Sequence, residues 1–496
     1  MEVLDCATEH GAPNGAVSEI LAFIMKSTPN HPITRRQFLA RSATATAAFS
    51  LVPRHVLGGA RFVPPSEKVN LAIIGCGGQG RTNSRALFHL PDVQITAVAD
   101  PQESFSLEGF YYRGVGGRKP VKAEIEKHYS AKTPNHRVAE YEDFRVMLEK
   151  EKGIDAVLCA TPDHQHAYVC VTAMRLGKHA YCEKPLTHNI WESRLVARVA
   201  KETGVATQLG NQGHSGEGIR QTCEWIWDGA IGEIREVHSW TSASRWNKGF
   251  ISGRPPAEPV PDGVNWDLWI GPREPRPFSS AYSPVTWRDY WDFGTAPIGD
   301  FFCHNFDPAC WALDLKAPIS VEASAAGGVD ADIAPVGALY FYEFGPRGNL
   351  PPVKFVWYEG GLMPQQPEGL EEGDQLGAGG NGILFIGSEG MITCPGWAGP
   401  PRFLPGSRID TYQRPPRTLK RSKGHHRDWI DACKGGDPAS ANFEYGAALT
   451  EVGLIGLVAL RTGKKILWDA AAMKATNAPE ADALIKGVYR PGWEPA

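Results

Sequence analysis

The sequence predicts an α/β fold with two parts: a doubly wound parallel sheet, then a second α/β domain built on an open, mostly antiparallel sheet. Three observations lead to this prediction. Apolar runs alternate with helical stretches from Val69 to Gly204, a pattern typical of parallel strands joined by helical crossovers. A glycine-rich segment directly follows the first apolar run. Beginning at Ile319, three runs of alternating polarity follow one another, as in an antiparallel sheet.

Length and composition limit the classes of protein that need to be considered. The chain has 496 residues, of which 42% are hydrophobic and 21% charged, enough for two or three globular domains. The net charge of −4 gives no reason to expect a polyanionic partner, and the short basic run at 414–429 does not change this, so we expect no nucleic acid. The 10 cysteines are scattered without zinc-ligand spacing, so we expect no metal.

A segment near the N-terminus is typical of export. Thr34 to Leu39 read TRRQFL, which resembles a twin-arginine signal, and small residues at 58–60 offer a cleavage site. The apolar stretch at 42–52 is too short and too polar for a stable transmembrane helix. We therefore assign 1–60 to a signal and leader, and predict recognition by the twin-arginine export machinery and a periplasmic or secreted location. The alternative is a chance arginine pair in a disordered tail.

The first predicted strand leads into a dinucleotide-binding motif, G-x-G-x-x-G. The strand at 69–74 is followed by a helical segment and a second strand that ends at Asp100. In such a unit the first glycine permits the turn, the second lets the backbone approach a pyrophosphate, and the third permits close packing of helix and strand. Asp100 is placed to bind a ribose diol and to repel a 2′-phosphate, so NAD is favoured over NADP. The predicted cofactor-binding residues here are Gly75, Gly77, Gly78, Gln79, Gly80 and Asp100.

Further strands and helices extend the parallel sheet. Strands are predicted at 154–162 and 178–185, and a helix beginning near Trp191 is closed by Gly204. Residues 103–137, rich in Tyr, Gly and Lys, are predicted to be an irregular insertion. A helix at 444–460 is expected to pack back near the first domain.

Together, four motifs resemble the Gfo/Idh/MocA oxidoreductase family, which includes glucose–fructose oxidoreductase and inositol dehydrogenase. They are the glycine motif, ATPDHQHA at 160–167, CEKP at 182–185 and GDFFCHNFD at 299–307. The resemblance extends from about Val69 to the C-terminus. It implies an NAD-binding Rossmann domain at 67–187 and a C-terminal catalytic and oligomerisation domain at 188–470, with a tail at 471–496. It also implies a homo-oligomer.

The resemblance assigns roles to the ends of two strands. Lys184 is implied to reach both the nicotinamide ribose and a substrate hydroxyl, with Pro185 often cis in this family. Ligands bind at the carboxyl ends of strands in doubly wound sheets, which favours this role over that of an ordinary surface lysine. The remaining residues that we assign to the cofactor are Thr161, Pro162, His164, Glu183 and Gln212.

Asp300 and His304 match the family pattern D-x-x-x-H, and together with Lys184 they are the predicted catalytic residues. Residues four apart share one helix face. A neutral imidazole with a pKa near 6.5 suits the removal of a hydroxyl proton, and a lysine ammonium stabilises developing alkoxide charge. Asp300 is expected to orient the site or to bind a neighbouring hydroxyl. Pro308 is predicted to kink the helix or end it early just after the base, because its ring clashes with the carbonyl of His304.

A segment rich in tryptophan, tyrosine and arginine, 241–291, suits a sugar-like polyol, since aromatic faces pack on sugar C–H faces. The alternatives are a loop packed over the sheet and an oligomer contact. We name Trp287, Arg288 and Asn211 as candidate substrate residues.

Export raises a question about the cofactor, because no nicotinamide pool exists outside the cytoplasm. We expect the cofactor to be tightly bound and the reaction to move hydride to or from a hydroxyl or ketone of a sugar, glycoside or cyclitol. One alternative is an NAD-dependent glycosidase or epimerase that oxidises its substrate transiently, although the Thr-His element associated with those glycosidases is replaced here by DFFCH. A second alternative is a non-catalytic sugar-binding protein.

Overall fold

The computed structural model describes residues 63–495, except 132, 134, 248, 250 and 251. Residues 67–496 cluster as one compact unit. The predicted twin-arginine segment lies outside the described residues, as does the whole predicted leader, 1–60.

The first sheet has six strands, all parallel, in the order β5-β2-β1-β6-β7-β8. Apolar residues alternate sides along β1: Ala72 and Ile74 belong to one buried cluster, and Leu71 and Ile73 belong to another. Both faces of the sheet are therefore covered, as expected for a doubly wound fold. The strands are β1 (Val69–Ile74), β2 (Val93–Ala99), β5 (Ala139–Tyr141), β6 (Ala156–Cys159), β7 (His179–Cys182) and β8 (Thr207–Leu209).

Helices connect these strands, including those predicted after the first strand and near Trp191. They are α4 (Gly78–Leu87), α5 (Arg118–Ser130), α6 (Phe144–Lys150), α7 (Asp163–Arg175) and α8 (Ile190–Thr203). Helix α8 begins with a capping box between Asn189 and Glu192 and ends at Gly204 in the left-handed conformation, which confirms the predicted end. The predicted first domain ends at residue 187. The parallel sheet continues beyond it, because its last strand, β8, runs to Leu209.

The prediction of an irregular insertion at 103–137 is wrong for its second half. Residues 118–130 form helix α5, whose Val121 and Ile125 are buried against the first sheet. Charged residues outnumber apolar ones in this helix, so its apolar period is weak in the sequence. The first half is a loop pinned by a small sheet of β3 (Phe105–Ser106) and β4 (Val115–Gly116).

The second sheet has nine strands in the order β15-β14-β13-β9-β12-β11-β10-β16-β17. Its one parallel pair joins β9 and β12, and the other pairs are antiparallel, so the predicted sheet type is confirmed. The strands are β9 (Ile234–Thr241), β10 (Ser320–Ala325), β11 (Ala338–Phe344), β12 (Val353–Tyr358), β13 (Asn381–Gly387), β14 (Gly390–Pro395), β15 (Arg402–Leu404), β16 (Ile466–Asp469) and β17 (Lys474–Ala475).

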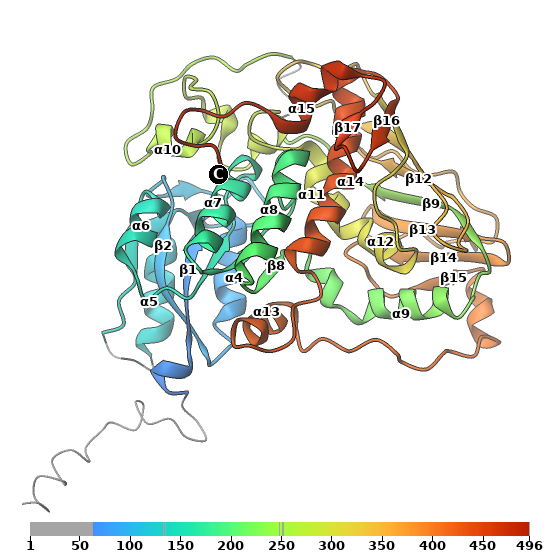
Figure 1. Ribbon diagram of the computed structural model, residues 1–496, viewed down its shortest axis with the longest axis horizontal. Coiled ribbons are helices and arrows are strands. Elements are labelled where there is room, and N and C mark those ends of the chain that lie inside the picture. Colours follow the sequence, from blue (N-terminus) through green and yellow to red (C-terminus); the bar gives the residue numbers. More distant parts are fainter. Residues whose placement is uncertain (1–62, 132, 134, 248, 250–251, 496) are drawn as a thin grey trace, which may run out of the picture. The chain divides into compact units, whose positions relative to one another are not determined.

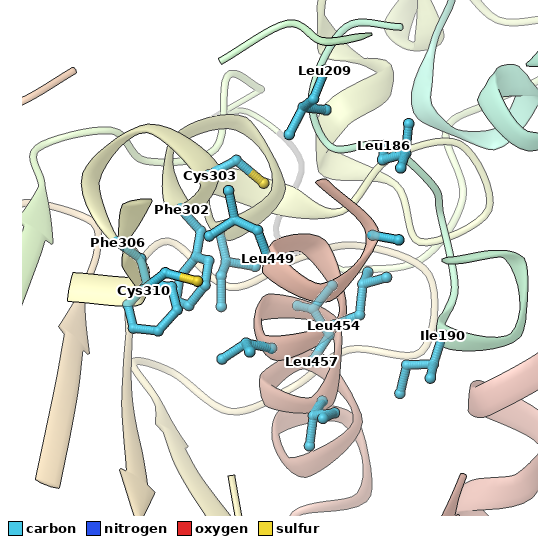
Figure 2. Packing of buried hydrophobic residues seen from close by; sticks show 14 of the residues in the cluster. Leu186, Ile190, Leu209, Phe302, Cys303, Phe306, Cys310, Leu449, Leu454 and Leu457 are labelled. Carbon is cyan, nitrogen blue, oxygen red and sulfur yellow. The ribbon is translucent and has the colours of Figure 1, made fainter. Parts of the chain in front are cut away.

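Helix α14 (Phe443–Thr462) joins the two sheets into one core, because it contacts α8 of the first part and β10 of the second (Figure 1). Figure 2 shows its leucines with Phe302 on one side and Ile190 on the other. This confirms the predicted packing of the 444–460 helix. By length and composition α14 is the one helix in the described ranges apolar enough to cross a membrane, but 83% of its apolar window is buried, as in a core helix.

The remaining α-helices are distributed over both parts of the fold, and the helix at His425–Cys433 packs on the first sheet through Trp429 and Ile430. These remaining helices are α9 (Glu217–Trp227), α10 (Trp266–Ile270), α11 (Ala296–Asn305), α12 (Asp307–Ala312), α13 (His425–Cys433) and α15 (Asp482–Lys486). Helix α11 ends before Phe306, and α12 begins with Pro308 as its second residue, so the predicted break after His304 is confirmed.

Candidate active site

A pocket lies at the carboxyl ends of the parallel strands, where doubly wound folds bind ligands. It encloses about 80 Å³. Eleven of the predicted site residues line it: Gly75, Gly77, Gly78, Gln79, Asp100, Thr161, Pro162, Glu183, Lys184, Trp287 and Arg288. Six do not: Gly80, His164, Asn211, Gln212, Asp300 and His304.

The glycine loop has the geometry of a phosphate cradle. Gly75 has a φ of +88°, which favours glycine, and a Cβ there would lie 2.6 Å from the backbone of Ala160. A Cβ on Gly80 would collide with the carbonyl oxygen of Gly75, so Gly80 serves the close packing that the motif predicts. A Cβ on Gly77 would meet nothing nearer than Phe105 at 3.9 Å. The space above Gly77 is therefore open to a ligand, and the loop fits a dinucleotide.

At Gly78 a side chain is excluded by another part of the chain, the ring of Tyr112. A Cβ there would enter the ring of Tyr112, whose hydroxyl donates to Gln79 Oε1 at 3.2 Å. Residues 105–117 thus form a loop that covers the glycine motif, and Tyr112 and Phe105 line the pocket. The sequence of this segment does not predict such a role, and only its tyrosine content hints at it.

Asp100 lies at the end of β2, as predicted for the ribose-binding acid. Its two carboxylate oxygens accept from the backbone N–H of Cys76 at 2.7 Å and of Gln102 at 2.8 Å. Burial raises the pKa of Asp100 to about 6, against the lowering effect of these two hydrogen bonds. The carboxylate holds the glycine loop in place and still lines the pocket.

Glu183 is the centre of a buried amide network. Its Oε1 accepts from Asn83 at 2.8 Å, from Gln79 at 3.2 Å and from Gln212 at 3.2 Å. Its Oε2 has no hydrogen-bond partner among the described residues. Gln212 therefore orients Glu183 from outside the pocket, and Glu183 keeps one buried oxygen unpaired.

His164 and Asn211 are placed differently from the prediction. The ring nitrogens of His164 contact the backbone carbonyls of Phe293 at 3.3 Å and Trp269 at 3.0 Å, so this histidine joins two loops and does not face the cofactor pocket. Asn211 is fully buried, and its amide donates to Asp307 Oδ2 at 2.9 Å. Each side chain is held by buried polar groups away from the pocket, which does not support the predicted roles.

Lys184, at the end of β7, meets the second domain at Asp300. The Lys184–Pro185 peptide bond is cis. The Lys184 ammonium forms an ion pair with Asp300 Oδ1, and Arg288 Nε lies 3.4 Å from Asp300 Oδ2. The side chains of Lys184 and Asp300 are only 14% and 8% exposed. The predicted catalytic lysine and aspartate are therefore in direct contact.

Lys184, Asp300 and Arg288 stabilise one another's charged forms. Burial alone would lower the pKa of Lys184, but the Asp300 carboxylate outweighs it and raises that pKa above its ordinary value. Burial alone would raise the pKa of Asp300, yet Lys184 and Arg288 hold that pKa well below its usual range. Lys184 is thus a cation and Asp300 an anion at neutral pH.

His304 lies one turn after Asp300 on α11 and is 4% exposed. Its Nδ1 has no hydrogen-bond partner in the described part of the chain. Burial, assisted by the Lys184 cation and opposed by Asp300, lowers the pKa of His304 to about 3. The expected pKa near 6.5 is therefore wrong, because the sequence pattern does not reveal how deeply α11 is buried.

One group of metal-ligating residue types occurs in the described ranges: Cys159, His166 and Cys182, with ligand atoms within 4.8 Å of one another. The ring nitrogens of His166 lie 2.7 Å from the carbonyl oxygen of Pro185 and 2.9 Å from that of Thr161. Both ring nitrogens thus lie within hydrogen-bond distance of a backbone carbonyl oxygen, which accepts from whichever nitrogen carries a proton. We assign no metal here. His166 instead fixes the backbone on both sides of the pocket.

Comparison with known proteins supports the same architecture. Residues 69–211 match the model of an oxidoreductase family with an NAD-binding Rossmann fold, and residues 236–341 match that family's C-terminal alpha/beta domain. The structure is similar to that of the WlbA dehydrogenase from Bordetella pertussis in complex with NADH and UDP-GlcNAcA. The TM-score is 0.53 at 16% identity, covering 81% of this chain and 99% of that one, which is a likeness of fold.

Two curated relatives have different activities. An alpha-N-acetylgalactosaminidase of Shewanella oneidensis is 24% identical over 221 residues, 41% of this chain and 45% of that protein. A scyllo-inositol 2-dehydrogenase (NAD(+)) of Bacillus subtilis is 30% identical over 145 residues, 29% of this chain and 36% of that protein. The matches span less than half the length of each relative. Both family domains are matched in order, the glycine cradle and Lys184 line one pocket, and Lys184 contacts Asp300 of α11. The chain therefore belongs to the Gfo/Idh/MocA oxidoreductase family.

Proposed function

We propose that this chain is an NAD-dependent oxidoreductase that moves hydride between a nicotinamide and a hydroxyl or ketone of a sugar, glycoside or cyclitol. The observation that carries the proposal is the contact between Lys184, at the end of a Rossmann strand, and Asp300, one turn before the neutral His304. When bound, NAD supplies the hydride acceptor. The glycine loop, Asp100 and Glu183 are the residues that would hold it.

The side chains divide the remaining chemistry between them. The Lys184 ammonium donates a hydrogen bond to the substrate oxygen and stabilises negative charge on it. The neutral imidazole of His304 accepts the hydroxyl proton. Asp300 keeps Lys184 charged and fixes its position, and Arg288 holds Asp300 from the other side.

The test begins with the purified, dialysed protein. Denaturation should release a nicotinamide nucleotide, and sugars or cyclitols added to the native protein should increase absorbance near 340 nm. Lys184→Ala should abolish this increase while the nucleotide remains bound. Protein that neither contains nor binds NAD would refute the proposal.

A second candidate is a glycosidase or epimerase that oxidises its substrate transiently, and the similarity to the alpha-N-acetylgalactosaminidase favours it. In that case the hydride returns to the same sugar, so nucleotide absorbance shows no net change over a turnover. Release of p-nitrophenol from a nitrophenyl glycoside by the NAD-loaded protein would identify this reaction.

We also propose that the cofactor stays bound between turnovers, that the protein is exported by the twin-arginine pathway to the periplasm or beyond, and that it is a homo-oligomer. The TRRQFL segment supports export. The loop at 105–117 supports retention, because Tyr112 packs on Gly78 and, with Phe105, lines the pocket. Replacing Arg35 and Arg36 with lysines should leave the protein in the cytoplasm, as fractionation would show.

A further inference from the structure

An exposed tryptophan lies directly beside the predicted base. Trp397, in the connection between β14 and β15, is 46% exposed, and its ring centroid lies 5.9 Å from that of His304. The ring also contacts Phe301 edge-on, with the two centroids 5.8 Å apart and an interplanar angle of 68°. Phe301 and His304 belong to the same helix as Asp300. The indole of Trp397 therefore lies next to His304, which follows Asp300 by one helical turn, and Asp300 in turn contacts Lys184.

The backbone holds this side chain in a conformation that non-glycine residues rarely adopt. Trp397 has a φ of +56° and Ala398 a φ of +54°, both in the left-handed region. Such residues are strained and tend to occur at functional sites, where the surrounding structure enforces them. Two in succession indicate that the fold fixes this loop firmly.

Several contacts hold the backbone of Trp397 and Ala398 in this conformation. The backbone N–H of Trp397 donates to Asn305 Oδ1 at 3.1 Å, and the amide of Asn305 donates to the carbonyl oxygen of Trp240 at 3.0 Å. On the other side, Gly213 and Gly218 make room for the loop. A Cβ on Gly213 would collide with the carbonyl oxygen of Trp397, and one on Gly218 would lie 2.5 Å from that of Ala398. Asn305 follows His304 directly, so the platform and the base are fixed by adjacent residues.

We propose that Trp397 is a binding platform for the ring of a carbohydrate or cyclitol substrate, positioned so that a ring hydroxyl meets His304. A half-exposed indole offers a flat apolar surface that matches the C–H face of a sugar ring. Beside it, the Nδ1 atom of His304 is buried and has no partner among the described residues, so it can bond a hydroxyl of that ring. This inference deepens the proposed function and rests on it for the identity of the reacting group.

The test uses the NAD-loaded full chain and measures sugar binding directly. Saturation-transfer difference NMR would be recorded with myo-inositol, methyl glucopyranosides and methyl N-acetyl-α-galactosaminide as cyclic probes, and with sorbitol as an acyclic control. Trp397→Ala keeps a Cβ, so it retains the left-handed backbone constraint and removes only the ring. Trp397→Phe keeps a smaller flat ring. Trp227→Ala is the matched control, because Trp227 is 50% exposed and lies on α9.

We expect Trp397→Ala to weaken binding of at least one cyclic probe about tenfold or more, equivalent to about 1.4 kcal/mol. Trp397→Phe should have an intermediate effect, and sorbitol should be insensitive to all three changes. The affinity for NAD, followed by fluorescence titration, should be unchanged. If that cyclic probe is turned over, KM should rise more than kcat falls.

Three results would overturn the inference: no cyclic probe binds the wild type, Trp397→Ala binds the cyclic probes as well as Trp227→Ala does, or Trp397→Ala also loses NAD. The last result would give Trp397 a purely structural role. Sugar binding that depends on Trp397 without any absorbance change at 340 nm would support the platform while contradicting the proposed oxidation, so the two failures are distinguishable.

Discussion

Lowering the pH from 8 to 5 tests the state of the predicted base. With a pKa of about 3, His304 is about 99% neutral at pH 5, whereas an imidazole with the ordinary pKa near 6.5 would be only about 3% neutral. If the neutral form of His304 accepts the substrate proton, the first case predicts almost no loss of rate and the second a loss of about 30-fold.

The assay is the rate of sugar oxidation at 340 nm, measured as kcat with NAD saturating. Saturation matters because Asp100, whose pKa is about 6, titrates in the same interval and faces the cofactor. Protonation of Asp100 should therefore appear as weaker NAD binding, with little change in kcat. His304→Gln should reduce kcat by about 10²–10⁴-fold at every pH.

A direct measurement complements the kinetics. The imidazole resonance of His304, labelled with ¹³C and assigned by its absence in His304→Gln, should not shift between pH 8 and 5. An inflection near pH 6.5 in this resonance, or in kcat of the saturated enzyme, would refute the argument that burial and the Lys184 cation keep His304 neutral.

Three further predictions concern the cofactor, the ion pair and acid stability. Tyr112→Ala should speed NAD release about tenfold or more in stopped-flow exchange, because its ring covers Gly78; unchanged release would show that the loop does not retain the cofactor. Lys184→Met should remove hydride transfer yet still fold, because Arg288 remains 3.4 Å from Asp300; loss of the folded circular dichroism spectrum would contradict this. Burial lowers the pKa values of His164 and His304 to about 3, below the unfolded value of about 6.5, so the unfolded chain binds more protons between these values. Stability should therefore fall as pH drops through this window, by about 2 kcal/mol per histidine at pH 5, and a melting temperature that rose on acidification would contradict the assignment.

The parts of the site that could be predicted follow local rules. The carboxyl ends of parallel strands meet at one edge of the sheet. The glycine motif, Asp100 and Lys184 each follow a strand, so they are expected to lie close together. The same reasoning explains why Asp300 and His304 share a helix face and why the helix ends before Pro308.

Other features depend on tertiary contacts that leave little trace in the sequence. The ring of Tyr112 lies on Gly78 only because β3 and β4 fold the loop back over the glycine motif. Trp397 adopts a positive φ without being a glycine: the glycines and prolines around it indicate a turn, but not the left-handed conformation of Trp397 itself. His164 stands in the motif DHQH, yet its place between two carbonyl groups is set by loops more than 100 residues away.

The low pKa of His304 bears on how the proposed reaction proceeds. An imidazole with a pKa of about 3 is a weak base toward an ordinary alcohol, so proton removal before hydride transfer is unfavourable. As hydride leaves the carbinol carbon, however, the hydroxyl becomes a protonated carbonyl, which is a strong acid and gives its proton even to a weak base. The site therefore favours proton transfer that accompanies or follows hydride departure. A solvent isotope effect on kcat that is small beside the effect of deuterium at the carbinol carbon would agree with this order, and the reverse ratio would contradict it.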